Sequence, residues 1–275
     1  MKKLYLSNSY KIFTSVKATS VLLLLLLTGS AQAATYTFVV QPILPPDRTV
    51  KAFTPLTDYL SKQTGHTIKL VTSLNFLSYW QNMKKPGKYD FILDAAHLTD
   101  YRLKRMNFKV LAKRADAVSY TLVAGEEAAI IEPEELIGKS LATIGSPSLG
   151  MLRLEEMFPN PLRQPVIIEV DNSLDSVQKV LDGKAQAAIV PTPMVGGFPT
   201  LLSIITTEQV PHTAVSAAPT VPADVRAAVR KALLEADKTD NGKKMLADIN
   251  FPSFEKTNAA AYEGFAGLLE GVWGY

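Results

Sequence analysis

Short apolar runs alternate with amphipathic segments along most of the chain. The runs are rich in β-branched residues, which is typical of buried strands, while the other segments carry apolar residues at helical spacing. The runs predict strands over residues 35–40, 67–71, 89–94, 109–112, 120–124, 139–144, 166–170, 185–190, 201–207 and 212–217. The helical spacing predicts helices over 49–64, 75–84, 98–105, 151–157, 173–181, 221–236, 242–249 and 257–269. Strands and helices that alternate in this way favour parallel, doubly wound sheets.

A proline interrupts the first predicted helix. Pro55 has no backbone N–H, so it predicts a kink or a restart of the helix, with Thr54 as a candidate cap. Gly65 is expected to end the helix, because glycine adopts the left-handed conformation that helix ends often need.

The segment from Lys139 to Gly150 is the first candidate ligand site. A predicted strand is followed by the small-residue turn Gly145-Ser146-Pro147-Ser148-Leu149-Gly150 and then by a predicted helix. This order leaves free backbone N–H groups at the carboxyl edge of a sheet, and such groups favour anions. Ser146 and Ser148 could add hydroxyl donors. Many α/β proteins have such a turn without a ligand, so a purely structural turn is the alternative at this point.

The first 33 residues predict a secretory signal peptide. Four lysines precede an apolar core over residues 21–27, and Ala31-Gln32-Ala33 supplies the small residues that a signal peptidase recognises. A membrane anchor is the weaker interpretation, because the core is much shorter than the ~20 residues that a spanning helix needs. No cysteine follows the core, which excludes a lipid anchor at this point. We therefore expect a mature chain that is free in the periplasm and not inserted in a membrane.

Removal of this peptide changes the charge balance. The whole chain has 29 basic and 26 acidic residues, a net charge of +3. Without the four lysines the counts are 25 and 26, a net charge of −1, so the composition gives no argument for a nucleic-acid partner. The chain has no cysteine and therefore no disulfide framework. The remaining length of about 242 residues is enough for one large domain or two lobes.

Several stretches, taken in order, resemble one protein family. They are Phe53, Pro55-Leu56, Asp58 and Tyr59-Leu60 in the first helix, Gly87-Lys88-Tyr89-Asp90-Phe91, Leu136 to Gly150, Asp182-Gly183-Lys184-Ala185-Gln186-Ala187-Ala188, and Pro219 with Pro222. In this order they resemble the phosphonate/phosphite/phosphate-type periplasmic solute-binding proteins of ABC transporters. The resemblance covers most of the chain after the predicted signal peptide.

The resemblance implies a fold, a division into domains and a motion. The expected fold is α/β, the two-lobed type II periplasmic-binding-protein fold, in which each lobe is a doubly wound, mostly parallel sheet with flanking helices. The first lobe would comprise residues 34–120 plus 211–275, and the second lobe residues 121–210. A ligand would bind in the cleft between the lobes, which would close around it.

The residues at the expected ligand site depart from the family pattern. The family's turn is rich in adjacent Ser and Thr, whereas here Pro147 lacks an N–H and Leu149 is apolar. The family's cleft strand usually ends in Gly-Pro, and here Asp94-Ala95-Ala96-His97 follows instead. The family often has an acidic residue after the strand that matches Ala187-Ala188, where it faces the amine of aminoalkyl ligands. Here the corresponding segment is Val190-Pro191-Thr192-Pro193. The scaffold therefore matches the family better than the ligand-binding residues do.

The candidate ligand-binding residues come from the strand ends and from one aromatic helix. They are Ser146, Ser148, Leu149, Gly150, Phe76, Tyr79, Asp94, His97, Asn172 and Thr192. Asp94 and His97 could instead cap a helix and lie at the surface, and the aromatic side chains could pack in the core. Arg102, Lys104 and Arg105 are interpreted as a solvated helix face. The three histidines are too scattered for a metal site, and no cofactor is expected.

Three functions stay open at this stage. The first is a periplasmic solute-binding protein that captures a phosphonate- or phosphate-like oxyanion and delivers it to an ABC permease. The second keeps the fold but binds an apolar or amphipathic ligand such as a lipid or sterol. The third is a periplasmic sensor or accessory module for a partner protein. An enzyme is not expected, because nucleophile-elbow, Walker A and dinucleotide fingerprints are absent from the sequence.

Overall fold

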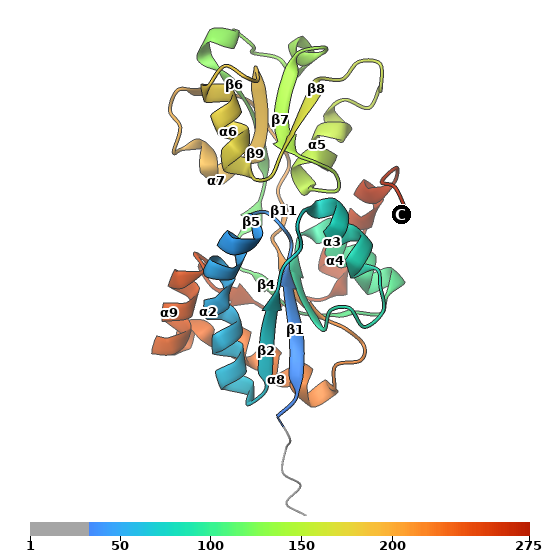
Figure 1. The fold of residues 1–275 in the computed structure, drawn as a ribbon, viewed down its shortest axis with the longest axis vertical. Coiled ribbons are helices and arrows are strands. Elements are labelled where there is room, and N and C mark those ends of the chain that lie inside the picture. The colour runs from blue at the N-terminus through green and yellow to red at the C-terminus, as the bar shows by residue number, and fades with distance from the viewer. Residues whose placement is uncertain (1–32) are drawn as a thin grey trace, which may run out of the picture. The chain divides into compact units, whose positions relative to one another are not determined.

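Two mixed sheets organise the chain in the computed structural model, which describes residues 33–275 (Figure 1). Residues 1–32, and with them nearly all of the predicted signal peptide, lie outside the described residues. Both sheets belong to one compact unit, Thr35–Tyr275. This arrangement is an α/β fold with flanking helices, as the alternation of apolar runs predicts.

The first sheet has the strand order β13-β4-β12-β3-β1-β2. Its strands are β1 (Thr35–Val40), β2 (Thr67–Val71), β3 (Phe91–Asp94), β4 (Lys109–Arg114), β12 (Ala214–Ala217) and β13 (Phe254–Glu255). Strand β1 pairs in parallel with β2 and β3, whereas β12 runs antiparallel between β3 and β4. The C-terminal part of the chain thus returns to this sheet.

The second sheet has the strand order β10-β6-β9-β7-β8. Its strands are β6 (Tyr120–Gly125), β7 (Ser140–Ile144), β8 (Val166–Val170), β9 (Ala187–Pro191) and β10 (Leu201–Thr206). Strand β7 pairs in parallel with β8 and β9, and β6 is antiparallel to both β9 and β10. Between the two sheets, β5 (Ala117–Val118) and β11 (Val210–Pro211) form a short antiparallel ribbon (Figure 1).

Helices follow the strands of both sheets. The α-helices are α2 (Pro46–Thr64), α3 (Phe76–Met83), α4 (Ala96–Arg105), α5 (Leu149–Met157), α6 (Ser173–Leu181), α7 (Thr192–Val195), α8 (Ala223–Leu234) and α9 (Asp240–Asp248). The 3₁₀ turns are η2 (Glu126–Ala128), η3 (Pro133–Leu136), η4 (Ala236–Lys238), η5 (Ala259–Tyr262) and η6 (Phe265–Leu269). The predicted helix over 257–269 is therefore two 3₁₀ turns, separated by Glu263 and by Gly264, whose φ is +96°.

The prediction of a helix restart at Pro55, with Thr54 as its cap, is wrong, whereas a kink at this position stays a prediction. Helix α2 runs through Pro55 without a restart, and Thr54 does not cap it, because its hydroxyl donates to the carbonyl of Val50 at 2.7 Å. Buried Phe53, Leu56 and Leu60 hold this helix against the core of the first sheet, which offsets the cost of one missing hydrogen bond. Gly65 ends the helix in the left-handed conformation, as predicted.

The apolar core of the first sheet is one continuous cluster of buried side chains from its strands and helices. It contains Phe38, Phe91, Leu56, Trp80 and Leu233 among its fully buried side chains. Two smaller clusters cover the faces of the second sheet, one centred on Leu122 and Leu141 and the other on Val123 and Ala188. Among the residues that the structure describes, no helix is long and apolar enough to cross a membrane.

Candidate ligand-binding site

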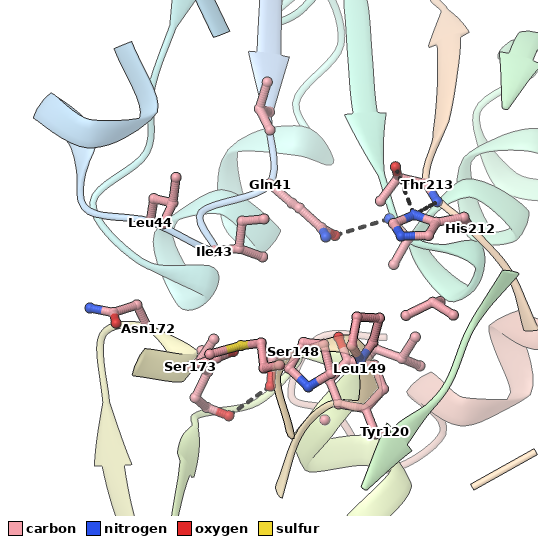
Figure 2. Close-up of a pocket in the computed structure, with 18 of the residues that line it drawn as sticks. Gln41, Ile43, Leu44, Tyr120, Ser148, Leu149, Asn172, Ser173, His212 and Thr213 are labelled. Atoms are coloured by element: carbon pink, nitrogen blue, oxygen red, sulfur yellow. Dashed lines mark hydrogen bonds between the residues drawn. The ribbon is translucent and has the colours of Figure 1, made fainter. Parts of the chain in front are cut away.

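A cavity of about 370 Å³ is lined by residues from both sheets (Figure 2). The side of the first sheet contributes Val40, Gln41, Ile43, Leu44, Arg48, Phe53, Phe76, Leu93, Ala95, Arg114, His212, Thr213, Asn250 and Phe251. Val118, in the ribbon, also lines it, and the side of the second sheet contributes Tyr120, Thr143, Ile144, Ser148, Leu149, Gly150, Asn172, Ser173, Leu174, Ile189, Pro191, Pro193 and Met194. A volume of this size is typical of small-molecule sites.

The cavity lies at the carboxyl ends of parallel strands. Gln41 directly follows β1, Ala95 follows β3, and Asn172 lies two residues after β8. In open α/β sheets this edge is where ligands bind, because the connections to the following helices leave a crevice there. The topology thus brings these residues together.

Two helix N-termini meet the cavity. Leu149 and Gly150 are the first two residues of α5, and Ser173 and Leu174 are the first two of α6; all four line the cavity. The backbone N–H groups of the first turn have no partner within a helix, and the aligned peptide dipoles make this end positive. The two helices therefore favour a negatively charged ligand group.

The side chains that cap these helices are already engaged. The Ser148 hydroxyl donates to the Ile144 carbonyl at 2.6 Å and accepts the N–H of Met151 at 3.2 Å. Asn172 accepts the N–H of Asp175 at 3.0 Å, and its amide nitrogen donates to the Asp175 carboxylate at 2.7 Å. The expected Ser148 hydroxyl donor is thus used to hold the turn. The N–H groups of the first two residues of each helix, which the caps do not engage, are left for a ligand.

Gly150 allows a close approach on the same side. A Cβ atom at this position would lie 3.2 Å from Cε1 of Tyr120, which also lines the cavity. The absence of a side chain therefore lets the Tyr120 ring pack against the first turn of α5. Burial raises the pKa of Tyr120 to about 12, so its hydroxyl stays protonated at neutral pH.

On the side of the first sheet, Gln41 and His212 face the cavity (Figure 2). The side-chain oxygen of Gln41, Oε1, accepts the N–H of Ala95 at 2.9 Å, which leaves the side-chain amide nitrogen as the available donor. His212 Nδ1 accepts the N–H of Thr213 at 2.7 Å, so the neutral ring carries its proton on Nε2. Burial, and then Arg114, lower the pKa of His212 to about 4. Both side chains therefore present uncharged N–H donors at neutral pH.

The only charged side chains among the described lining residues are arginines. Arg114 Nε lies 2.7 Å from Asp116 Oδ1, and its guanidinium lies 4.7 Å from the centre of the Phe251 ring. Arg48, in the first turn of α2, has no ion-pair partner within residues 33–275 and is exposed. Because none of the lining residues is Asp or Glu, the cavity favours a negatively charged ligand over a positively charged one.

Sequence comparison identifies the family. The family model described as "ABC transporter, phosphonate, periplasmic substrate-binding protein" matches residues 38–262, most of the chain. The chain belongs to this family. No curated protein has a sequence that matches this chain.

Solved structures of low sequence identity share the fold of this family member. Prochlorococcus marinus PhnD1 in complex with methylphosphonate is 14% identical with a TM-score of 0.76, and the match covers 86% of this chain and 97% of that one. A binding protein component of an ABC phosphonate transporter from Pseudomonas aeruginosa is 14% identical with a TM-score of 0.73, covering 86% and 85%. A Xanthomonas citri protein bound to ATP is 12% identical with a TM-score of 0.69, covering 86% and 96%. These are type II periplasmic binding folds, which agrees with the predicted fold class.

The structure brings half of the predicted site residues together around the cavity. Ser148, Leu149, Gly150, Phe76 and Asn172 line it. Ser148 and Asn172 do so as capping residues, as described above. Their contact with a ligand stays a prediction.

The other half lies away from the cavity lining. Tyr79 and Asp94 are fully buried, and the Tyr79 hydroxyl donates to Asp94 Oδ2 at 2.5 Å. Thr192 bonds through its hydroxyl to Ser119 at 2.8 Å and Thr121 at 3.0 Å, between strands of the second sheet. Ser146 is not among the lining residues, although its neighbour Ser148 is. The candidate site therefore does not include these residues.

His97 is also buried, but it joins elements of the two sheets. Its Nε2 lies 3.0 Å from the carbonyl oxygen of Pro147, in the turn before α5. Its Nδ1 is buried without a hydrogen-bond partner. Burial lowers the pKa of His97 to about 4, so the ring is neutral and the bond is made by an Nε2–H donor. His97 thus positions the candidate turn and does not line the cavity.

Arg102 is not on a solvated helix face, contrary to the prediction. Its side chain is fully buried and contacts both carboxylate oxygens of Asp94, the second through Nη2 at 2.6 Å. Nη2 also donates to the Ser216 hydroxyl at 3.0 Å. The charge is tolerated in the interior because its partners satisfy it.

Sequence reasoning missed the cavity residues Gln41, Arg48, Arg114 and His212. Gln41 carries a usable signal, since a polar residue directly after a parallel strand lies at the ligand edge of a sheet. His212 precedes β12, which reaches the same edge only because it runs antiparallel, and no local pattern reveals that direction. Within residues 33–275 no group of acidic or histidine side chains could hold a metal ion.

Proposed function

We propose that this protein is a periplasmic substrate-binding protein that captures a phosphonate- or phosphate-like anion in the cavity and delivers it to an ABC permease. The observation that carries the proposal is the combination of two helix N-termini and two arginines around a cavity with no carboxylate in its described lining. Positive helix ends and guanidinium groups stabilise a tetrahedral oxyanion. Family membership supports the same class of ligand, since the family model describes phosphonate transport.

The proposed mechanism uses the two sheets as lobes. The predicted lobes, residues 34–120 plus 211–275 and residues 121–210, would close on the ligand by bending at the ribbon of β5 and β11. The first lobe would supply Gln41, His212 and the arginines, and the second would supply the N-termini of α5 and α6. Closure would surround the anion with donors from both sides and create the shape that a permease recognises.

Calorimetric titration of the purified protein with phosphate, phosphite and methylphosphonate tests the ligand class. Binding of at least one of these anions is expected. At a free concentration about 100-fold above Kd, the anion should also raise the free energy of unfolding by about 2.7 kcal/mol, which a thermal-shift assay detects. Binding of none of them would contradict the proposal.

A proline substitution tests the contact with α6. Ser173 is the first residue of α6, where proline is compatible with a helix, and Asn172 before it is extended with φ −156° and ψ 165°. Ser173→Pro should therefore remove one N–H donor, together with the Ser173 hydroxyl, and preserve the helix. Ser173→Ala removes the hydroxyl alone, so the difference in affinity between the two variants isolates the N–H donor. We expect affinity for the anion to fall roughly ten- to hundredfold, the range for one hydrogen bond to a charged group.

Ala223→Pro is the matched control. Ala223 is the first residue of α8, which does not line the cavity, and Pro222 before it is also extended. This variant should bind the anion as the native protein does. Native affinity in Ser173→Pro would contradict the role proposed for the α6 N-terminus.

A further inference from the structure

We infer that the ligand is an anion that carries an uncharged, apolar substituent, and that the cavity discriminates against anions with an ammonium group. This inference rests on the proposed function and narrows its ligand class. Three features of the cavity lead to it: the donors among its polar groups, the apolar surface on both sides, and the lack of a carboxylate to pair with a cation.

Several polar side chains of the lining are already engaged. The groups of Ser148 and Asn172 form the helix caps, and the Thr143 hydroxyl donates to the Ile144 carbonyl at 3.4 Å. The side-chain oxygen of Gln41 and Nδ1 of His212 each accept a backbone N–H group. The side-chain donors that remain, on Arg48, Arg114, Gln41 and His212, suit one anionic group. Hydroxyl or amide groups remain on Tyr120, Ser173 and Asn250, which are few compared with the apolar side chains of the same lining.

Apolar side chains from both sheets form most of the remaining lining. Ile43, Leu44 and Phe53 come from the first-sheet side, and Leu174, Ile189 and Met194 from the second-sheet side. Figure 2 shows Ile43 and Leu44 across the open space from Ser148 and Leu149. Apolar surface that faces a binding cavity gains free energy when an apolar ligand group displaces water from it.

The volume also exceeds what the anion alone requires. A tetrahedral oxyanion has only five heavy atoms, whereas the cavity holds about 370 Å³. The apolar surface and the spare volume belong to the same cavity as the positive helix ends. A substituent attached to the anion would occupy this space.

An ammonium group on the ligand would find no carboxylate among the described lining residues. The cavity has two arginines and no carboxylate among its described residues, and both lining helix ends are positive. A cation transferred there would lose its hydration without an ion pair to compensate. The site should therefore prefer an alkyl group over an aminoalkyl group of the same size.

Two isosteric probes separate these possibilities. Propylphosphonate and 2-aminoethylphosphonate have the same number of heavy atoms and differ in a terminal methyl or ammonium group. In calorimetric titrations, propylphosphonate should bind more than tenfold tighter than 2-aminoethylphosphonate. Its affinity should also exceed that of methylphosphonate by up to about 15-fold, because each of its two additional methylenes contributes roughly fourfold.

A charge introduced at the apolar rim should reverse the order. Leu174 lines the cavity and is 47% exposed, so Leu174→Glu should fold normally. This variant should bind propylphosphonate more weakly and 2-aminoethylphosphonate more tightly than the native protein does. Leu162→Glu, at a residue that is 93% exposed and not in the lining, is the matched control and should keep the native order.

The outcomes distinguish the inference from the proposed function. Binding of 2-aminoethylphosphonate as tightly as propylphosphonate would overturn the inference, while phosphonate binding itself would still support the proposed function. Tighter binding of methylphosphonate than of propylphosphonate would also overturn the inference alone. Binding of a neutral apolar compound without any binding of phosphate, phosphite or phosphonates would overturn both.

Discussion

At the scale of single residues, a buried ion pair holds the end of β3. Asp94 accepts from Arg102, Tyr79 and Thr99, and Arg102 also reaches Ser216 on β12. The next residue, Ala95, lines the cavity and bonds to Gln41. The network therefore links the interior of the first sheet to the edge where the ligand is proposed to bind.

Removing Arg102 should destabilise the protein strongly. Arg102→Met leaves Asp94 buried without its cation, which typically costs about 3–5 kcal/mol. The free energy of unfolding, measured by urea titration, should fall by that amount.

Arg105→Met on the same helix is the control for this prediction. Arg105 is exposed and has no ion pair within residues 33–275, and its guanidinium lies 5.7 Å from the centre of the Tyr275 ring, so we expect a loss of at most about 1 kcal/mol. Equal stability losses in the two variants would contradict the interpretation of Arg102 as part of a buried network.

The sequence predicts which residues form strands and helices better than it predicts which other side chains these residues contact. The apolar runs identified the strands, since burial is a local property of the pattern. The basic neighbours Lys104 and Arg105 predict a surface position for Arg102, and no local pattern indicates that its side chain meets Asp94. Likewise, the sequence predicts the turn that contains Ser148, but the bond from its hydroxyl to Ile144 depends on how the turn folds back.

At the scale of elements, the start of α5 is attached to the first sheet. Leu149 packs with Ala95, Val118 and Val210, and Leu152 belongs to the core of the first sheet. The bond from His97 Nε2–H to the Pro147 carbonyl adds a polar contact to this apolar junction. The turn that presents its N–H groups to the cavity is thus positioned from both sides.

This junction should make the protein sensitive to acid. The pKa of His97 is lowered to about 4 in the fold, below the ordinary value of about 6.5 that applies when the chain unfolds. The charged groups that act on the ring are Asp94, Arg102 and Arg153. Because the unfolded chain binds the proton more readily, this stability is present above pH 6.5 and is lost as pH falls towards 4. Its loss between pH 7 and pH 5 should be about 2 kcal/mol.

The variant His97→Gln isolates this effect. Glutamine does not titrate, and its amide nitrogen can donate to the same carbonyl. Urea unfolding at pH 7 and pH 5 should show a smaller loss of stability in the variant, by about 2 kcal/mol, while the contribution of His212 stays in both proteins. An identical pH dependence in the two proteins would exclude His97 as its source.

At the scale of the whole molecule, two sheets joined by narrow connections surround one cavity. The chain passes between the sheets around β5 and again around β11, and these strands pair only with each other. Few backbone hydrogen bonds at this ribbon therefore oppose a rotation of one sheet against the other. The contacts of Leu149, Leu152 and His97 between the start of α5 and the first sheet do oppose it, and they have to rearrange when the sheets rotate. The donors proposed for the anion lie on both sides, so the ligand gains its full set of contacts only in the closed arrangement.

We therefore expect the ligand to compact the protein. Small-angle X-ray scattering should give a smaller radius of gyration at saturating propylphosphonate than without ligand, because the population shifts towards the closed arrangement. Leu174→Glu at the same propylphosphonate concentration serves as the control and should show a weaker change, since its affinity for this anion is expected to be low. A radius of gyration that is unchanged when calorimetry shows saturation would mean that the cavity binds without closure, as a preformed site between two fixed sheets.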